Sequence, residues 1–254
     1  FHGHTAWLGG VALSRDGRMV VTGSYDDTAI LWEIVTGQKR QVFKGQGNVN
    51  SVALSSDARR LVTSSYYHAA IVWDTATGNK LQSFAATNSS FRSVALSGDG
   101  TLIATASGED RTAILWEAAS GKKLQTFVGH TRHVSSVALS REGKRLWTAS
   151  FDGTTRLWDT CTGQELCRLR RFDRGKEWLV VTPDGFFDGS PGAWRFVTYR
   201  VEGTLTLIDD DATRKQFHRP GLLAQLHRPI VLVKVERQGE PAVPIAPGNL
   251  EGLW

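Results

Sequence analysis

One recurring stretch, Gly10-Val-Ala-Leu-Ser-Arg-Asp-Gly17, decides how this chain folds. Its Val-Ala-Leu-Ser core begins at Val11 and returns at Val52, Val94 and Val137, with spacings of 41, 42 and 43 residues. A tryptophan recurs in phase at Trp32, Trp73, Trp116 and Trp158, and a Thr-Gly or Ser-Gly turn follows each one. Self-similarity with a period of about 20 to 50 residues indicates a repeat architecture. We therefore predict four copies of one unit over residues 1–171, at about 1–42, 43–83, 84–126 and 127–171.

Each unit is predicted to contain four short β-strands. In the first unit, strand-like runs at 10–14, 19–22, 28–32 and 39–43 are separated by turn residues. The last run alternates polar and apolar residues, which is typical of a half-exposed outer strand. A lone sheet of this kind would leave its apolar faces and its edge uncovered, so the units must stack on one another. Radial stacking predicts an all-β propeller whose blades are these sheets.

These units resemble WD repeats, which have Gly-His near the start, an aspartate before the third strand and Trp-Asp at its end. The resemblance implies a hydrogen-bonded chain of His, Thr, Asp and Trp inside a blade. The matching residues are His4, Thr22, Asp26 and Trp32 in repeat one, and His130, Thr148, Asp152 and Trp158 in repeat four. Repeat two has Gln46 and Tyr67 in place of the histidine and the aspartate, and repeat three has Thr87 and an extra residue before Asp110. We expect blades two and three to be looser for this reason.

The resemblance also bears on the number of blades. Seven blades are common in this family. Because this chain has four or five predicted blades, we expect a longer chain or neighbouring chains to complete the ring. Phe1 corresponds to Phe43, Phe84 and Phe127, which end the fourth strand of each unit, and this match predicts a preceding blade.

Weaker repeat features continue beyond residue 171. Runs at 177–181, 186–190, 195–201 and 204–208 predict a degenerate fifth blade within 172–210, with a small separate β-hairpin unit as the alternative. Residues 211–226 are predicted to be helical, capped by Asp209–Asp211 and divided at Pro220-Gly221. A further strand over 229–235 and a linker after Gly239 complete the segment 211–254.

The segment 177–190, with Arg219-Pro220 downstream, resembles the region that follows the WD repeats in large bacterial multidomain proteins. Many of those proteins carry a caspase-like peptidase or another effector module elsewhere in the polypeptide. The resemblance implies a bacterial source and an effector outside this chain.

The composition and motifs favour a globular, non-catalytic protein. Hydrophobic residues make up 41% and charged residues 22%, which are ordinary globular values. No apolar run approaches the roughly 18–20 residues that span a bilayer, which argues against a membrane partner. Neither a Gly-x-Ser-x-Gly nucleophile elbow nor a P-loop occurs. Cys161 and Cys167 fit two reduced cysteines of a cytoplasmic protein, with a disulfide across one turn as the alternative. We expect no catalytic residue, cofactor or metal site.

A propeller of this kind would use its loops for recognition. In related propellers, the loops that precede the first strand and those that join the second and third strands converge on one face. Residues at such positions, with types that dominate interface energetics, are Trp7, Tyr25, Tyr66, Arg92 and Phe151. The alternative is that these side chains only fill the loop layer above the core.

Basic residues gather in two groups, Arg168, Arg170, Arg171, Arg174 and Lys176, and then Arg214, Lys215, His218 and Arg219. They are interpreted as solvated charges, with a surface for nucleic acid or an acidic partner as the alternative; the net charge of +5 permits either. The leading hypothesis is a protein–protein interaction scaffold within a larger protein. The alternatives are a ligand-sensing module that controls an attached effector and, less favoured, a nucleic-acid-binding platform.

Overall fold

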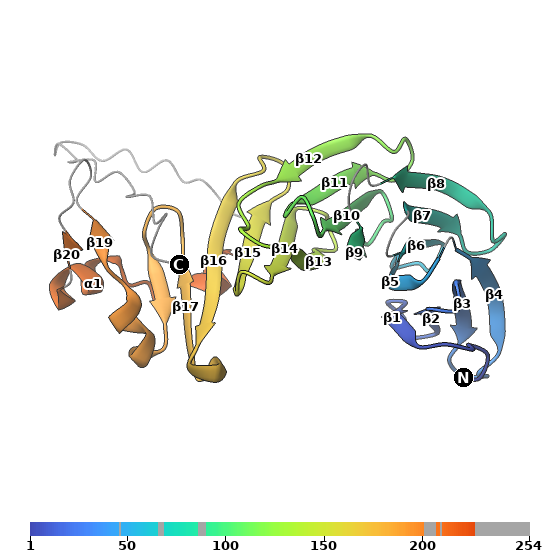
Figure 1. The fold of residues 1–254 in the computed structure, drawn as a ribbon, viewed down its shortest axis with the longest axis horizontal. Helices are drawn as coiled ribbons and strands as arrows, with labels where there is room; N and C mark the ends of the chain where they lie inside the picture. The colour runs from blue at the N-terminus through green and yellow to red at the C-terminus, as the bar shows by residue number, and fades with distance from the viewer. Residues whose placement is uncertain (46, 66–68, 86–89, 201–206, 209, 227–254) are drawn as a thin grey trace. The chain divides into compact units, whose positions relative to one another are not determined.

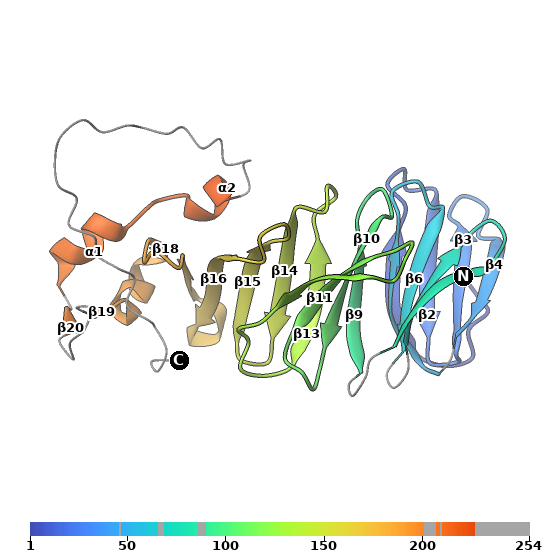
Figure 2. The same cartoon turned by 90° about the horizontal axis from the view of Figure 1, so that it is seen from above.

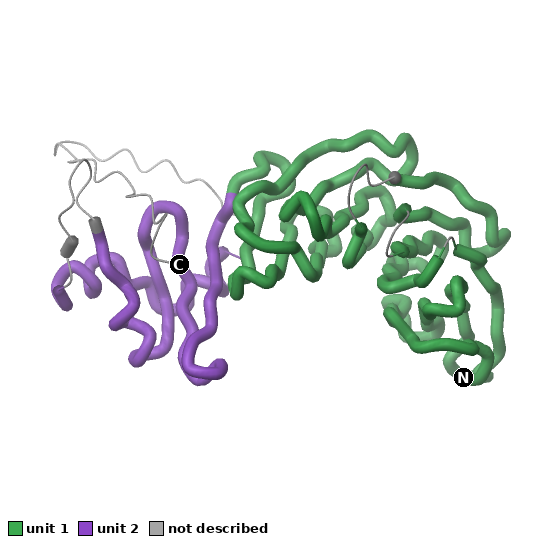
Figure 3. Tube along the Cα trace, in the orientation of Figure 1, with its two compact units in different colours: residues 1–164 green, residues 165–254 purple. Residues whose placement is uncertain are grey.

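The protein consists of two compact units, residues 1–164 and residues 165–254 (Figure 3). The structure is a computed structural model, and it describes residues 1–45, 47–65, 69–85, 90–200, 207–208 and 210–226. Figures 1 and 2 show the strands of the first unit gathered into successive sheets.

The first unit contains the predicted repeats as antiparallel sheets with strands in chain order. Sheet one comprises β1 (Leu8–Leu13), β2 (Met19–Ser24), β3 (Thr28–Glu33) and β4 (Lys39–Lys44). Sheet two comprises β5 (Val49–Leu54), β6 (Arg60–Ser65), β7 (Ala69–Asp74) and β8 (Lys80–Ala85). Sheet three comprises β9 (Phe91–Leu96), β10 (Leu102–Ser107), β11 (Ala113–Glu117) and β12 (Lys123–Phe127). The strands of sheet four that belong to this unit are β13 (Val134–Leu139), β14 (Arg145–Ser150) and β15 (Thr154–Asp159). The all-β class and the blade-like sheets predicted from the sequence are confirmed.

The recurring Ser-x-Asp-Gly segment makes the turn between the first two strands. Ser14 Oγ donates to Asp16 Oδ1 at 2.6 Å and accepts from the backbone N–H of Met19 at 2.9 Å. Gly17 has a φ of +68°, a left-handed conformation in which a glycine avoids the clash of a Cβ. Repeats two and three make the same pair of bonds. In repeat two, however, Ala58 occupies the left-handed position with a φ of +58°.

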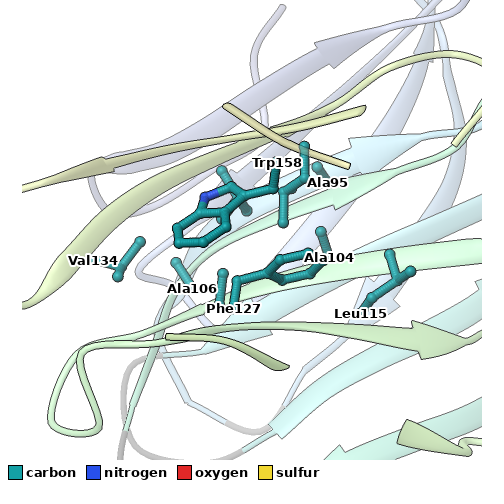
Figure 4. Close-up of a cluster of buried hydrophobic side chains, with 10 residues drawn as sticks. Ala95, Ala104, Ala106, Leu115, Phe127, Val134 and Trp158 are labelled. Carbon is teal, nitrogen blue, oxygen red and sulfur yellow. The ribbon is translucent and has the colours of Figure 1, made fainter. Parts of the chain in front are cut away.

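Neighbouring sheets pack face to face through apolar side chains. Between sheets three and four, Ala104, Leu115 and Phe127 meet Val134 and Trp158 in one buried cluster (Figure 4). The same arrangement recurs between sheets one and two. At each junction the last phenylalanine of one sheet contacts the repeat tryptophan of the next, with ring centroids 5.3–5.7 Å apart, for the pairs Phe43–Trp73, Phe84–Trp116 and Phe127–Trp158. The four tryptophans therefore lie on matching strands of successive sheets.

The first sheet differs from the others in the exposure of its innermost strand. Val52, Val94 and Val137 are 5–7% exposed because a preceding sheet covers them, whereas Val11 is 66% exposed. Phe1 contacts Trp32 with ring centroids 5.3 Å apart, like the phenylalanines at the other junctions. The prediction of a preceding blade remains a prediction.

The second unit corrects the expected fifth blade. Its first two expected strands are present as β17 (Glu177–Val181) and β18 (Phe187–Gly189), but β17 pairs with β16 (Glu165–Phe172), which the sequence assigned to repeat four. These strands therefore extend a sheet that contains β16 instead of beginning a new one. The 3-10 helix η2 (Pro191–Phe196), which begins at a proline that cannot donate a ladder hydrogen bond, takes the start of the expected third run, so that run and the fourth keep only short strands outside this sheet.

The rest of the second unit is short elements. The 3-10 turn η1 (Asp173–Gly175) joins β16 to β17, and β19 (Tyr199–Arg200) pairs with β20 (Leu207–Ile208) as a separate two-stranded sheet. The predicted helical stretch is confirmed as α1 (Asp211–Phe217) and α2 (Leu222–Leu226), divided at Pro220-Gly221, and Asp210 caps α1 by accepting from the N–H of Thr213. The expected strand 229–235 and the linker lie outside the described residues.

Within the described ranges, none of the helices has the length and apolar character needed to cross a bilayer.

Candidate functional site

A chain of hydrogen bonds crosses the first sheet and links four side chains. Trp32 Nε1 donates to Thr22 Oγ1 at 2.8 Å, and Thr22 Oγ1 lies 2.8 Å from His4 Nε2. His4 Nδ1 lies 2.9 Å from Asp26 Oδ2. In the fourth repeat, Trp158, Thr148, His130 and Asp152 make the same three contacts at 2.8–2.9 Å. All eight residues that the sequence assigned to these networks are therefore brought together as expected.

The chemistry of the two ends fixes the direction of the bonds. An indole N–H can only donate and a carboxylate can only accept. With a neutral histidine, Nδ1–H of His4 donates to Asp26, so Nε2 accepts from the hydroxyl of Thr22, which in turn accepts from Trp32. Every polar atom in this nearly buried chain then has a partner, which burial requires. The chain of bonds thus links β2 and β3 to the segment before β1.

The aspartate of each network is held in its ionised form. Burial alone would raise the pKa of Asp26, but hydrogen bonds from Thr28, from the backbone N–H of Thr5 and from His4 outweigh it and lower the pKa to about 2. Burial likewise opposes ionisation of Asp152, and bonds from His130 and Thr154 hold its pKa well below the usual range. The carboxylates are therefore charged at neutral pH.

Each of these carboxylates joins two loops. Asp26 Oδ1 accepts from the hydroxyl of Thr28, at the start of β3, at 2.6 Å. Asp26 Oδ2 accepts from the backbone N–H of Thr5, in the segment before β1, at 2.9 Å. In repeat four, Asp152 binds Thr154 and the N–H of Thr131 in the same way, at 2.6 and 3.1 Å. The segment before the first strand is thus fixed to the loop between the second and third strands.

The two joined loops carry the predicted recognition residues of repeat one. Tyr25 precedes the aspartate, and its N–H donates to the carbonyl of Trp7 at 2.9 Å. Trp7 is 82% exposed and Tyr25 is 39% exposed. The network below therefore presents two aromatic side chains to solvent on a fixed backbone.

Repeat four repeats this arrangement and adds a cation from repeat three. The N–H of Phe151 donates to the carbonyl of His133 at 3.0 Å, and Phe151 is 55% exposed. His133 meets Phe151 edge to face and lies 2.6 Å, through Nδ1, from the carbonyl oxygen of Gly108. The guanidinium of Arg92 lies 5.7 Å from the centre of the Phe151 ring. The structure thus brings Arg92 and Phe151 together, while Tyr66 lies outside the described residues.

Two threonines belong to the networks although the sequence prediction omitted them. Thr28 and Thr154 each bond the aspartate and lie 3.3 Å, through Oγ1, from Nδ1 of the network histidine. The signal that could have found them is the spacing Asp-x-Thr, because a threonine two residues after an aspartate is placed to donate to its carboxylate in a turn. Asn50, on β5, donates through its side-chain amide to the carbonyl of Phe91 at 2.9 Å and accepts from the hydroxyl of Ser64.

Repeats two and three keep the inner part of the hydrogen-bonded chain. Trp73 donates to Thr63, and Trp116 donates to Thr105, both at 2.9 Å. Asp110 of repeat three accepts from Ser107 Oγ at 3.0 Å. Gln46, Tyr67 and Thr87 lie outside the described residues, so the expected looseness of these blades stays a prediction.

In the part of the chain that the structure describes, no three His, Cys, Asp or Glu side chains gather as a metal-binding group. Cys161 is exposed and Cys167 is buried, and both are free thiols, so the alternative of a disulfide between them is wrong.

Comparison with known proteins agrees with the geometry of the sheets. The WD40 family (WD domain, G-beta repeat) matches residues 1–33, 37–74, 78–117 and 121–159, which is more than half of the chain. No curated protein matches the chain. Repeats of this family are generally non-enzymatic scaffolds for protein interaction. With four matched repeats, and with the His–Thr–Asp–Trp networks in the first and the fourth, the chain belongs to the WD40-repeat family.

Proposed function

We propose that this chain is a non-catalytic scaffold that binds a partner protein, or another domain of its own polypeptide, through the loops of repeats one and four. The observation that carries the proposal is that exposed aromatic side chains stand on backbone fixed by the hydrogen-bonded networks: Trp7 and Tyr25 in repeat one, and Phe151 in repeat four. Large aromatic residues that are already ordered lose little entropy on binding, and they dominate interface energetics.

Arg92 extends this surface with a charge beside Phe151. A guanidinium next to an aromatic ring can bind a carboxylate while the ring covers apolar atoms of the same partner. The segment 177–190 supports placing the chain within a larger bacterial protein, and the two free thiols agree with a cytoplasmic location. An effector controlled by the propeller would lie elsewhere in that protein.

A peptide library displayed on phage, selected against the whole chain, tests the proposal. Peptides selected in this way should lose about tenfold or more in affinity for a variant with Trp7→Ala, Tyr25→Ala and Phe151→Ala, since each removed aromatic anchor costs on the order of 1 kcal/mol or more. The melting temperature should change little because these side chains are exposed. The matched control is Val35→Ala with Val128→Ala, which truncates two other exposed apolar residues. Equal binding to both variants would reject these loops as the binding surface.

A further inference from the structure

The second unit carries a layered stack of basic and aromatic side chains. The ring of Phe172, at the end of β16, stacks on Phe196 of η2 with centroids 4.4 Å apart and an interplanar angle of 14°. The guanidinium of Arg170 lies 5.4 Å from the centre of the Phe172 ring, and that of Arg195 lies 4.8 Å from the centre of the Phe196 ring. We call these four residues the arginine–phenylalanine stack.

One end of this stack is anchored and the other is open. Phe172 is half-buried against an apolar cluster that includes Leu179 and Phe187. Phe196 is 42% exposed, and Arg195 is exposed as well. Because Phe172 stacks on Phe196 and the Arg195 guanidinium lies over the Phe196 ring, the open end of the stack is a planar guanidinium supported by that ring.

Basic residues are frequent in the sequence around Phe172. Between Arg168 and Lys176 the chain has five basic residues and one carboxylate, Asp173; Arg168 is paired with Glu165 at 3.1 Å, and Arg171 lies on the opposite face of the β16–β17 pair to Phe172. Arg174 and Lys176 are exposed in and beside the turn η1. The next carboxylate, Glu177, accepts from the hydroxyl of Ser190. This stretch therefore carries a local excess of cations.

The turn that presents these cations has an unusual backbone. Asp173 and Arg174 have φ values of +46° and +54°, so two successive residues with side chains adopt the left-handed conformation. Each such residue costs about 1–2 kcal/mol compared with the right-handed conformation. Strain of this kind concentrates at functional sites, where it fixes a side chain in position. Here it fixes the backbone at Arg174, two residues after Phe172 of the stack.

We propose that the arginine–phenylalanine stack, with Arg174 and Lys176, binds single-stranded nucleic acid. Bases stack on aromatic rings and on guanidinium planes, and this interaction tolerates any sequence because every base has a π face. Phosphates of the same strand pair with the cations of the turn. An acidic protein would use these charges but would gain nothing from the flat open end of the stack. This site shares no residue with the proposed protein-binding surface.

Fluorescence polarisation of the whole chain with a labelled oligothymidine of about twenty nucleotides, longer than a single site of this type, tests the stacking part. Phe196→Leu keeps an apolar side chain but removes the flat ring, and it should weaken binding about tenfold. The matched control is Trp178→Leu, because Trp178 pairs with Arg171 and so projects from the opposite face of the β16–β17 pair to Phe172. That variant should bind like the wild type, and a thermal melt checks that both variants fold.

A second pair of variants tests the charges. Arg174→Ala with Lys176→Ala should flatten the dependence of log affinity on log salt by about 0.7 for each phosphate contact removed. Lys122→Ala with Lys123→Ala makes the same charge change at exposed positions of the first unit and should leave the slope unchanged. A duplex of the same length should bind more weakly than the single strand because its bases are not free to stack.

Three results would overturn the proposal. If the double variant at Arg174 and Lys176 and the control at Lys122 and Lys123 lost the same affinity for the oligonucleotide, only the net charge of the chain would matter. The patch would be a site for an acidic protein if two results were found together. Polyglutamate would displace the labelled oligothymidine as well as unlabelled oligothymidine does, and the Phe196→Leu variant would bind oligothymidine like the wild type. Failure to bind oligothymidine at low salt would exclude the site altogether. The peptide-binding test of the loops is unaffected by any of these outcomes.

Discussion

Repeats one and four tie two loops together through an aspartate and a histidine, whereas repeats two and three lack that histidine in their sequence and share with them the Trp–Thr bond inside the sheet. The Trp–Thr bond is 2.8–2.9 Å in all four repeats. It joins neighbouring antiparallel strands, so the sheet alone produces it. The bonds of Asp26 and Asp152 reach backbone and side chains in the loops, and they accompany the exposed aromatic residues beside them. The comparison thus indicates two roles: the Trp–Thr bond joins strands within a blade, and the aspartate bonds order the loops.

The largest expected effect is the loss of a network carboxylate. Asp152→Ala leaves His130, whose side chain is 1% exposed, without its partner and should lower the free energy of unfolding by about 3 kcal/mol. Asp110→Ala in repeat three removes a more exposed carboxylate and should cost about 1 kcal/mol. Urea unfolding followed by tryptophan fluorescence measures both. Similar losses would show that the two kinds of repeat do not differ in this respect.

The threonine at the centre of each chain gives the next largest contrast. Thr22→Val should cost about 2–3 kcal/mol because it removes the bonding partner of both Trp32 and His4, whereas Thr63→Val affects only Trp73 and should cost about 1 kcal/mol. The shape of the side chain is nearly unchanged in both variants, so denaturation compares the hydrogen bonds directly. If Thr63→Val proved the more damaging, the proposed division between complete and partial networks would fail.

Acid should weaken the complete repeats selectively. The pKa of Asp26 is lowered to about 2, so its ionised form stabilises the folded state fully above the pKa of the unfolded chain, near 4. That stabilisation, roughly 2 kcal/mol, is lost as the pH falls from about 4 towards 2. The double variant Asp26→Asn with Asp152→Asn should be less stable at neutral pH but should lose less on acidification. Parallel pH profiles for the variant and the wild type, measured by urea unfolding, would contradict this account.

The smallest expected effect concerns the first turn of repeat two. Ala58 adopts a φ of +58° where repeats one, three and four have Gly17, Gly100 and Gly143 at +68° to +74°. Ala58→Gly should therefore raise the free energy of unfolding by up to about 1 kcal/mol, and Gly17→Ala should lower it by a similar amount. A loss of stability in Ala58→Gly would mean that the turn is not strained.

The repeat units and their inner networks could be predicted because their determinants are local or periodic. Strand alternation, Asp-Gly turns and a regular tryptophan fix four antiparallel strands in each unit. The histidine and aspartate of a network are 22 residues apart in both complete repeats, so a repeat pattern finds them. Thr28 and Thr154 were missed because they bond the second carboxylate oxygen, Oδ1, and only the folded turn shows that Oδ2 is the oxygen that faces the histidine.

Local residue patterns were sufficient to predict the WD-type repeats, the His, Thr, Asp and Trp of both networks and the division of the helix at Pro220-Gly221, since each depends on short-range geometry that residue type controls. Three contacts required the folded arrangement of the chain: the pairing of β17 with β16, the position of Arg92 beside Phe151 and the stacking of Phe172 on Phe196. A strand with unpaired edges can hydrogen-bond to any suitable neighbour, and side chains far apart in the chain meet only when packing selects one arrangement. That selection is a property of the whole fold and is not encoded in any single segment.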